Sequence, residues 1–327
     1  MLPINKFLPQ VIGHFSEHNN LVLQAEPGAG KSTALPQYLL KNLALQGKKI
    51  LMLEPRRVAV KSIANFLAKQ LGEKVGQTVG YQIKNERCVS KETVLEIITE
   101  GILTRRLQQD PEINDIALIF DEFHERSIHS DLSLLLALEI QQALREDLKL
   151  LVMSATIDTQ SLAKYLDDCA IISCPGRAFP IELLYQAKAR EQEQLSAQVL
   201  SAVKTTLSKH PHGDVLIFLP GQSEIRRCLS AVKEHYSDTN SLLFLPLYGG
   251  LSLKAQEQAL LADTQGRRKL IFSTNLAETS LTIEGITAVI DSGLERQMRY
   301  DPNSGMSRLL TGPISKASAE QRKGRAG

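Results

Sequence analysis

Ten residues near the N-terminus have the types and spacing of a phosphate-binding loop: Gln-Ala-Glu-Pro-Gly-Ala-Gly-Lys-Ser-Thr at positions 24–33. A short apolar run, Leu21–Leu23, precedes them and a helical pattern, Ala34–Gln46, follows, so the order is strand, glycine loop, helix. Glycines let backbone N–H groups close around phosphate oxygens, and the helix N-terminus adds partial positive charge. Lys31 is then expected to reach the β- and γ-phosphates, and the Ser32 hydroxyl to ligate magnesium.

The strict pattern has glycine six residues before the lysine, where this chain has Ala25. The spacing and the flanking elements still favour a phosphate-binding loop. The alternative, a glycine-rich turn that caps a helix, leaves Lys31 and Ser32 without a role.

Two adjacent carboxylates follow another apolar run. Asp121 and Glu122 come directly after Ala117–Phe120, which is typical of a strand buried on both faces. Open α/β sheets bind ligands at the carboxyl ends of their strands. Asp121 is therefore predicted to hold the magnesium coordination shell, and Glu122 to orient and deprotonate an attacking water. A charged surface loop is the alternative, but a phosphate-binding loop about 90 residues upstream makes this pair the expected second half of a nucleoside triphosphatase.

Short apolar runs alternate with helical patterns through the first half of the chain, which predicts an α/β fold with a parallel sheet covered on both faces. The expected strands are Leu21–Gln24, Lys49–Leu53, Val94–Ile98, Ala117–Phe120, Leu150–Met153 and Ala170–Ser173, with helices such as Val58–Leu71 and Leu132–Leu144 between them. The alternation of strands and helices is interrupted at Cys174–Pro180, where Pro and Gly indicate a turn. We therefore expect one domain over residues 1–178 and a second over 179–327.

The second half repeats the same alternation of strands and helices. Its expected elements are helix Gln192–Ser208, strand Asp214–Leu219, helix Gln222–His235, strand Ser241–Leu247, helix Leu253–Ala262, strand Lys269–Ser273 and strand Thr287–Asp291. Turn residues between two strand-like pieces in Arg299–Leu309 predict a β-hairpin. This hairpin is either an edge element or a protrusion near a nucleic-acid path.

Bulk composition excludes several classes of protein. The 327 residues carry a net charge of +2, so any nucleic-acid contact must come from local patches rather than from overall charge. The four cysteines lack zinc-site spacing, and no apolar run has the length of a membrane span. No signal peptide is evident, so we expect a soluble, cytoplasmic protein with reduced thiols and no membrane partner.

Together the two chemical motifs resemble those of the DEAH-box helicases of superfamily 2, and in detail the bacterial HrpB-type branch. Asp121-Glu122-Phe123-His124 differs from the family's Asp-Glu-Ala-His only at its third position. Further stretches match the family in its order: Leu2-Pro3-Ile4, Leu53–Ala59 (motif Ia), Thr99–Gly101 (motif Ib), Ser154–Thr156 (motif III), Phe218–Gly221 (motif IV), Ser273–Thr282 (motif V) and Gln321–Gly327 (motif VI). The chain ends within motif VI, so the sequence is interpreted as truncated to the two RecA-like domains of this family.

The resemblance implies a role for each matched residue. ATP, with other NTPs possible, and Mg²⁺ are the implied ligands, bound by Gly28, Ala29, Gly30, Lys31, Ser32, Thr33, Ser280, Thr282, Glu284 and Arg322, with Ser32 and Asp121 on the metal. Catalytic roles fall to Glu122, Asp121, His124, Gln321 and Arg325, where Arg325 matches one arginine finger and His124 couples the nucleotide site to the second domain. Nucleic-acid contacts are implied for Arg56, Arg57, Lys84, Thr99 and Asn275. Without the motif context, a structural interpretation of Arg56 and Arg57 is favoured, in which they pair with Glu54 or cap carbonyls.

The implied function is an ATP-dependent RNA helicase or translocase that binds ATP in the cleft between its domains and moves along single-stranded RNA. Two alternatives stay open: a nucleotide-switched RNA-binding or remodelling protein without processive unwinding, and a DNA-directed motor. A metabolic phosphoryl-transfer enzyme would not require motifs V and VI. Single-stranded or duplex RNA is the expected partner, a protein activator is possible, and a monomer is the expected state.

Overall fold

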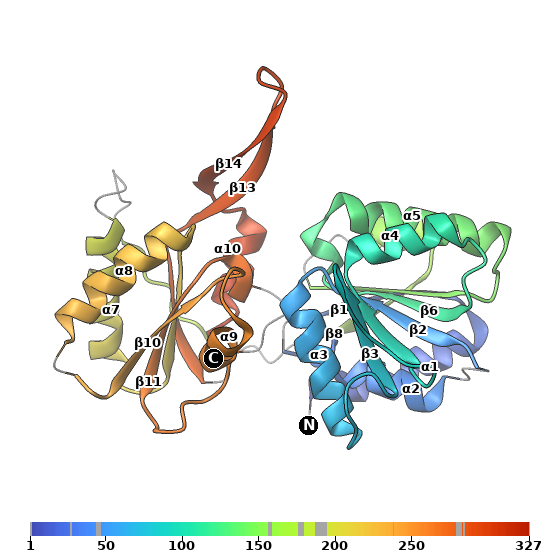
Figure 1. Ribbon diagram of the computed structural model, residues 1–327, viewed down its shortest axis with the longest axis horizontal. Coiled ribbons are helices and arrows are strands. Elements are labelled where there is room, and N and C mark those ends of the chain that lie inside the picture. The colour runs from blue at the N-terminus through green and yellow to red at the C-terminus, as the bar shows by residue number, and fades with distance from the viewer. Residues whose placement is uncertain are drawn as a thin grey trace. The chain divides into compact units, whose positions relative to one another are not determined.

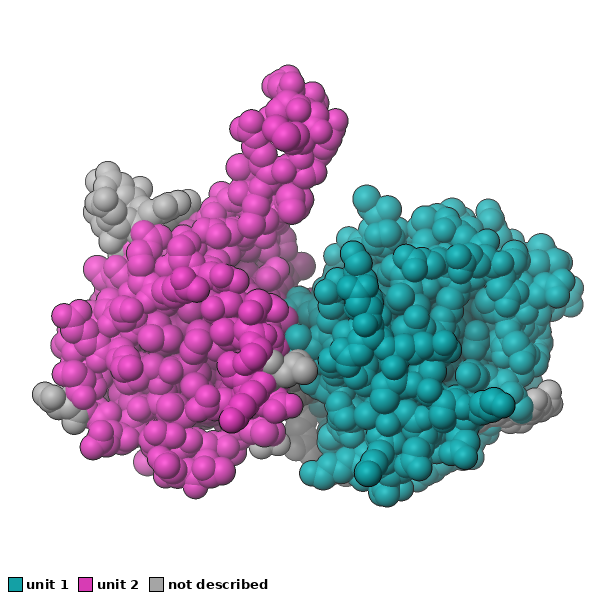
Figure 2. Space-filling view, in the orientation of Figure 1, with its two compact units in different colours: residues 1–177 teal, residues 178–327 magenta. Residues whose placement is uncertain are grey.

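The computed structural model describes residues 2–26, 28–43, 47–155, 159–175, 180–186, 195–237, 239–278, 283 and 285–326. The chain divides into two compact units, residues 1–177 and 178–327 (Figures 1 and 2). The predicted boundary between residues 178 and 179 falls in the segment 176–179, outside the described residues. In the described part of the chain, no helix has the length and apolar character needed to cross a membrane.

Unit 1 is built on a sheet in the order β4-β3-β5-β2-β6-β7-β1-β8, with only β4 antiparallel to its neighbour. Its strands are β1 (Asn20–Ala25), β2 (Lys49–Leu53), β3 (Val79–Ile83), β4 (Glu86–Cys88), β5 (Leu95–Ile98), β6 (Asp115–Phe120), β7 (Lys149–Ser154) and β8 (Ala170–Cys174). The helices are η1 (Pro3–Lys6), α1 (Leu8–Glu17), α2 (Ala34–Asn42), α3 (Arg57–Gln70), α4 (Glu100–Gln109), η2 (Phe123–Glu125), α5 (Ile128–Ala143) and α6 (Thr159–Tyr165).

Helices cover both faces of this sheet, as the continuous apolar strands predict. Side chains of α4, α5 and α6 pack with one face of the strands in a single core cluster that includes Val22, Phe120 and Val152. Helices α1 and α2 lie on the opposite face (Figure 1). Strand β6 is buried from Ile116 to Phe120, which is typical of a central parallel strand. The predicted parallel sheet is confirmed, and each predicted strand of this half lies within two residues of an observed one.

Two strands of unit 1 have no counterpart in the sequence prediction. Strand β3 carries Gly80, and a Cβ at that position would lie 2.6 Å from the carbonyl oxygen of Cys88 in β4. Glycine thus permits the close approach of the two strands, but it also weakens the sequence pattern of a strand. Strand β4 has only three residues, which is too short for a recognisable alternation.

Unit 2 has a smaller parallel sheet in the order β10-β11-β9-β12. Its elements are α7 (Leu195–Lys209), β9 (Asp214–Phe218), α8 (Gln222–His235), β10 (Leu242–Leu247), α9 (Leu253–Leu260), β11 (Arg268–Ser273), η4 (Asn275–Ala277), β12 (Ile286–Asp291), β13 (Leu294–Asp301), β14 (Met306–Pro313) and α10 (Lys316–Lys323). Helices α7 and α8 pack on one face of the sheet. A second cluster, which includes Ala259 of α9, covers the other face.

Strands β13 and β14 form an antiparallel hairpin that projects from the body of unit 2 (Figure 1). The predicted hairpin is confirmed, but its arms are longer than Arg299–Leu309. The arms are largely exposed, with Met298 67% and Tyr300 66% accessible, so they lack the alternation that marks a half-buried strand.

Candidate nucleotide and nucleic-acid site

One edge of the unit 1 sheet gathers most of the predicted site residues. The phosphate-binding loop follows β1, Asp121 and Glu122 follow β6, and Arg56 follows β2. Lys84 comes after β3, and Thr99 comes after β5. These strands run parallel in one sheet, so the residues after them meet at its carboxyl edge. The order β3-β5-β2-β6-β7-β1 places the predicted nucleic-acid residues toward one end of this edge and the predicted nucleotide residues toward the other.

The loop after β1 has the backbone conformation that its glycines allow. Gly28 and Gly30 have φ values of 77° and 99°. The first turn of α2 begins there, since Ala34 donates its N–H to the Gly30 carbonyl at 2.9 Å. The segment η1 supports the loop, because Ile4 donates its N–H to the Ala29 carbonyl at 3.1 Å and its side chain is fully buried.

The loop and the acidic motif converge. The Lys31 side chain is buried, and its Nζ has no hydrogen-bond partner among the described residues. Asp121 is also buried, and its Oδ2 is similarly without such a partner in the described part of the chain. Burial, followed by the charge of Glu122, raises the pKa of Asp121 to about 7, against the lowering effect of Lys31 and Ser32.

A buried ammonium beside a hydroxyl and a carboxylate fits a magnesium nucleotide. Magnesium prefers oxygen ligands and keeps several waters and substrate phosphate oxygens in its shell. Ser32 and Asp121 supply two such oxygens, and Lys31 supplies the charge for phosphate. Unpaired buried polar atoms are costly, so a ligand that pairs with them gains binding energy.

Glu54, which was predicted only as a partner of arginine, belongs to the same edge. Leu53 pairs with Phe120 in the sheet register, so Glu54 and Asp121 leave adjacent strands side by side. Glu54 is fully buried, and burial, together with the charges of Asp121 and Glu122, raises its pKa well above the usual range. One signal in the sequence could have found it: a carboxylate directly after an apolar strand.

Glu122 sits on a strained backbone. Its φ of 50° and ψ of 36° lie in the left-handed region, which is uncommon for a residue with a side chain and is often associated with function. Its Oε2 lies 3.3 Å from Nε2 of His124. Its N–H donates to Oδ1 of Asp121 at 2.9 Å. Asp121 therefore fixes the backbone of Glu122, and His124 lies within ion-pair distance of its carboxylate.

His124 links the acidic motif to the loop after β7. The N–H of Ala155 donates to its Nδ1 at 3.3 Å, and burial lowers the pKa of the imidazole. A neutral ring that accepts at Nδ1 carries its proton on Nε2, and this buried nitrogen has no hydrogen-bond partner in the described part of the chain, although it lies 3.3 Å from the Glu122 carboxylate. Thr156, the next residue of this motif, lies outside the described residues.

The predicted nucleic-acid residues of unit 1 differ in exposure. Arg57, the first residue of α3, and Lys84, in the turn between β3 and β4, are exposed. The Arg56 guanidinium pairs with Glu125 at 3.2 Å, and its backbone N–H donates to Glu54 at 3.1 Å. These contacts with Glu125 and Glu54 support the structural interpretation of Arg56. Thr99 is half-buried as the residue before α4, and its hydroxyl does not cap the helix.

Unit 2 holds the remaining predicted residues. Asn275 is exposed at the start of η4, and Gln321 is buried on α10. Arg325 donates from Nε and Nη2 to the carbonyl of Glu278, at 2.9 and 2.7 Å. Ser280, Thr282 and Glu284 lie outside the described residues.

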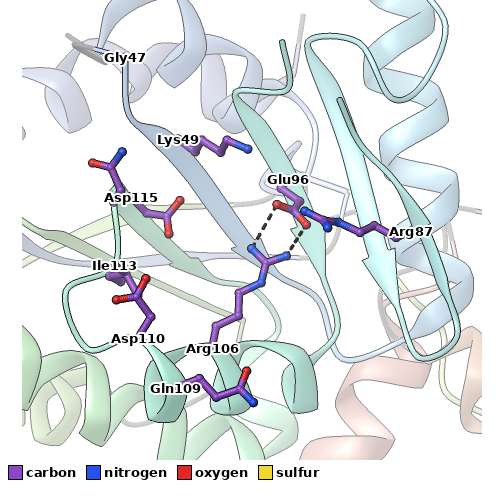
Figure 3. Close-up of a pocket in the computed structure, with 10 residues that line it drawn as sticks. Gly47, Lys49, Arg87, Glu96, Arg106, Gln109, Asp110, Ile113 and Asp115 are labelled. Atoms are coloured by element: carbon purple, nitrogen blue, oxygen red, sulfur yellow. Dashed lines mark hydrogen bonds and ion pairs between the residues drawn. The ribbon is translucent and has the colours of Figure 1, made fainter. Parts of the chain in front are cut away.

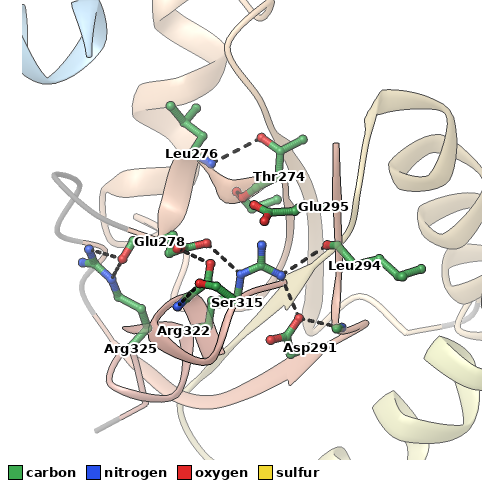
Figure 4. Close-up of polar contacts among 12 residues, drawn as sticks. Thr274, Leu276, Glu278, Asp291, Leu294, Glu295, Ser315, Arg322 and Arg325 are labelled. Carbon is green, nitrogen blue, oxygen red and sulfur yellow. Dashed lines mark hydrogen bonds and ion pairs between the residues drawn. The ribbon is translucent and has the colours of Figure 1, made fainter. Parts of the chain in front are cut away.

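Arg322, which was predicted to bind nucleotide, has ion-pair partners within unit 2. Its side chain is 1% exposed and pairs with Glu278 and Asp291 at 2.8 and 2.9 Å (Figure 4). These contacts give the guanidinium a structural environment of its own. Sequence reasoning missed Glu278 and Asp291 because their relation to Arg322 exists only in the folded unit.

A polar cavity of about 300 Å³ lies at the amino ends of β2, β5 and β6, away from the site residues (Figure 3). Arg106 crosses it to pair with the buried Glu96, and Asp115 lines it. Burial raises the pKa of Asp115 to about 6, although Arg106 opposes that change. The cavity therefore contains the Arg106–Glu96 ion pair and a buried Asp115 carboxyl group whose pKa is raised.

Comparisons with known proteins agree with this geometry. Residues 6–165 match the family described as DEAD/DEAH box helicase, and residues 198–327 match the helicase conserved C-terminal domain. The chain is 44% identical over all 327 residues to the ATP-dependent RNA helicase HrpB of Escherichia coli strain K12, of which it covers 40%.

Two solved structures of E. coli HrpB, described as a DEAH/RHA helicase and as a DExH-box NTPase, match the whole chain. Their TM-scores are 0.93 and 0.84, at 44% and 43% identity, and the chain covers 41% and 40% of them. The chain thus spans about two fifths of the length of these relatives.

Proposed function

Because the chain belongs to the DEAD/DEAH box helicases, we propose that the protein is an ATP-dependent RNA helicase or translocase, which couples ATP hydrolysis to movement along single-stranded RNA. One observation carries the proposal. The buried Lys31 ammonium, Ser32 and the buried Asp121 carboxylate converge on the carboxyl edge that also bears the exposed residues Arg57 and Lys84.

In the proposed reaction, water attacks the γ-phosphorus of ATP, a P–O bond forms, and the bond to the ADP oxygen breaks. Lys31 compensates phosphate charge in a site where burial strengthens the interaction. Magnesium, held by Ser32 and Asp121, would neutralise charge on the β- and γ-phosphates. Glu122 orients the water and accepts its proton, and the imidazole of His124 lies 3.3 Å from that carboxylate.

Unit 2 has proposed roles in the same reaction. Arg325 would supply the cation for charge that develops on the transferred phosphoryl group, and Gln321 would contact that group or the water. Ser280 and Thr282 of motif V are proposed to link nucleotide state to domain closure, and Glu284 is proposed to lie near the ribose.

RNA binding is proposed to depend on the sugar–phosphate backbone. Arg57 and Lys84 are exposed cations, with Thr99 near them along the edge and Asn275 contributing from unit 2. Contacts to phosphates give little sequence specificity and strong dependence on salt.

ATP hydrolysis with and without single-stranded RNA tests the proposal. The test compares the wild-type protein with Lys31→Ala and Glu122→Gln, and it uses Lys41→Ala, an exposed lysine of α2, as the matched control. We expect RNA to stimulate the wild type and Lys41→Ala alike. Loss of the general base is expected to lower kcat by about 100-fold or more in Glu122→Gln. RNA-stimulated turnover that survives in Lys31→Ala would contradict the proposed nucleotide site.

Two further measurements separate the alternatives. Strand displacement that requires ATP supports a helicase, whereas ATP-dependent RNA affinity without displacement would indicate a nucleotide-switched clamp. Competition between RNA and DNA strands of matched sequence decides the nucleic acid, because 2′-hydroxyl contacts distinguish the two.

The proposed location is the cytoplasm, and the proposed state is a monomer. All four cysteines have free thiols, and burial raises the pKa of Cys169 and Cys228 to about 11 and about 12. The raised pKa makes these two thiols poorly reactive.

A further inference from the structure

We propose that Arg322 is a positioning residue that fixes Arg325 to the base of the β13–β14 hairpin, so that both respond together when nucleotide binds. The inference rests on the proposed function, because it takes Arg325 as the residue that meets the transferred phosphoryl group. It concerns contacts within unit 2 alone (Figure 4).

Glu278 connects the two arginines through different atoms. Its carboxylate accepts a hydrogen bond from Nε of Arg322 at 2.8 Å and another from the hydroxyl of Ser318. Its backbone carbonyl accepts both donors of Arg325, at 2.9 and 2.7 Å. The position of the Arg325 guanidinium therefore depends on the conformation that Arg322 and Ser318 impose on Glu278.

The same guanidinium reaches the base of the hairpin. Nη1 of Arg322 donates to Oδ1 of Asp291 at 2.9 Å and to the carbonyl of Leu294, the first residue of β13, at 3.3 Å. Asp291 also accepts the N–H of Gly293 at 2.9 Å, which fixes the turn between β12 and β13. Both ends of the hairpin are held there, since Ile314 donates its N–H to the Gly293 carbonyl at 3.1 Å.

Arginine is required for this geometry. The guanidinium lies 4.8 Å from the ring centroid of Phe218, and its side chain is 1% exposed, so it packs against the core as well as pairing. Its Nε donates to Glu278 and its Nη1 donates to Asp291, whereas a lysine ammonium is a single point of charge. Its loss would leave two partly enclosed carboxylates with no cation between them.

The experiment compares Arg322→Lys with Ser318→Ala and with a matched control, Arg296→Gln. Arg296 also anchors β13, but it pairs with Glu224 of α8 at 3.2 Å and so leaves the Glu278 link intact. Ser318→Ala removes only one hydrogen bond to Glu278, so it tests the link if Arg322→Lys folds poorly. The readouts are kcat and KM for ATP in the presence of RNA, and amide hydrogen exchange at Gly293 and Leu294 with and without a non-hydrolysable ATP analogue.

In the wild type we expect the analogue to slow exchange at these two amides. Arg322→Lys should abolish that effect and lower kcat about tenfold while KM changes by less than about twofold, because transition-state positioning is lost and ground-state binding is kept. Ser318→Ala should produce a smaller change in the same direction. Arg296→Gln should retain both kcat and the nucleotide-dependent exchange.

A raised KM with unchanged kcat in Arg322→Lys would overturn the inference, because it indicates direct nucleotide contact. So would a fall in kcat only in proportion to the unfolded fraction, or the absence of any effect of the analogue on exchange in the wild type. A wild-type protein without RNA-stimulated hydrolysis would instead refute the proposed function. An active wild type with an indistinguishable Arg322→Lys would refute this inference alone.

Discussion

Gly30→Ala should disrupt the phosphate-binding loop before any nucleotide is present. Gly30 has φ of 99°, and a Cβ there would lie 2.8 Å from Cδ1 of Leu2 and 3.1 Å from Cγ2 of Ile4. The left-handed backbone costs an alanine about 1–2 kcal/mol, and crowding of a packed site adds about 1–3 kcal/mol. Leu2 is 41% exposed and can move away, but Ile4 is fully buried and cannot, so we expect a total in the lower half of the combined range, about 3 kcal/mol.

Gly28→Ala is the matched control for this substitution. Gly28 has φ of 77°, but nothing lies within 4 Å of the position its Cβ would take, so only the backbone cost of about 1–2 kcal/mol applies. The assay is native-state hydrogen exchange of the Ala34 amide, which donates to the Gly30 carbonyl and reports local opening of the loop. Exchange at Ala34 should be about tenfold faster in Gly30→Ala than in Gly28→Ala, since about 1.4 kcal/mol corresponds to a factor of ten.

A double variant locates the crowding. Leu2→Ala in the Gly30→Ala background should recover part of the lost protection, whereas Leu2→Ala in the Gly28→Ala background should not. Equal protection in Gly28→Ala and Gly30→Ala, with no recovery by Leu2→Ala, would refute the claim that η1 packs against the loop and supports it.

Three other outcomes are expected. Asp115→Asn should stabilise the protein more at pH 8 than at pH 4.5, as measured by urea unfolding. Burial raises the folded-state pKa of Asp115 to about 6. The free energy of unfolding of the wild type should therefore fall by at most about 3 kcal/mol as the pH rises from about 4 to about 6. An unchanged pH profile in the variant would contradict this assignment. Ser127→Ala should cost about 1 kcal/mol, measured in the same way, because Ser127 accepts the N–H of Ser130 at the start of α5. Removal of magnesium by a chelator should reduce ATP hydrolysis to background and leave the circular dichroism spectrum unchanged. Added Mg²⁺ should restore ATP hydrolysis. Full activity in the chelator would rule out the proposed roles of Ser32 and Asp121.

The sequence predicted well those elements whose signals are local. The strands of unit 1 that are buried on both faces appear as short apolar runs, and α3 was placed within one residue of its observed bounds. The short strand β4 and the exposed arms of the hairpin were missed or shortened, because periodicity requires length and one buried face.

Some site residues could be predicted and others could not, again according to whether their signals are local in the sequence. Lys31 and Asp121 stand in compact patterns with defined flanking elements, so their chemistry could be inferred before their proximity was known. Glu54 was not recognised as part of the acidic cluster, since only the β2–β6 register places it beside Asp121. Arg322 was predicted to bind nucleotide because its neighbours in the motif were as well, and its ion pairs with Glu278 and Asp291 became visible only in the folded unit.

By itself, the sequence determined the chemistry that this protein can hold: a phosphate-binding loop, an acidic pair after a buried strand, and two α/β halves. These follow from residue type and short-range spacing, which dictate local backbone geometry. The tertiary structure decided which charges meet. Strand order brings residues about 90 positions apart to one sheet edge, and burial then shifts the pKa of Asp121 and encloses Arg322. Desolvation and pairing depend on the surroundings of a side chain in space, so no local pattern encodes them.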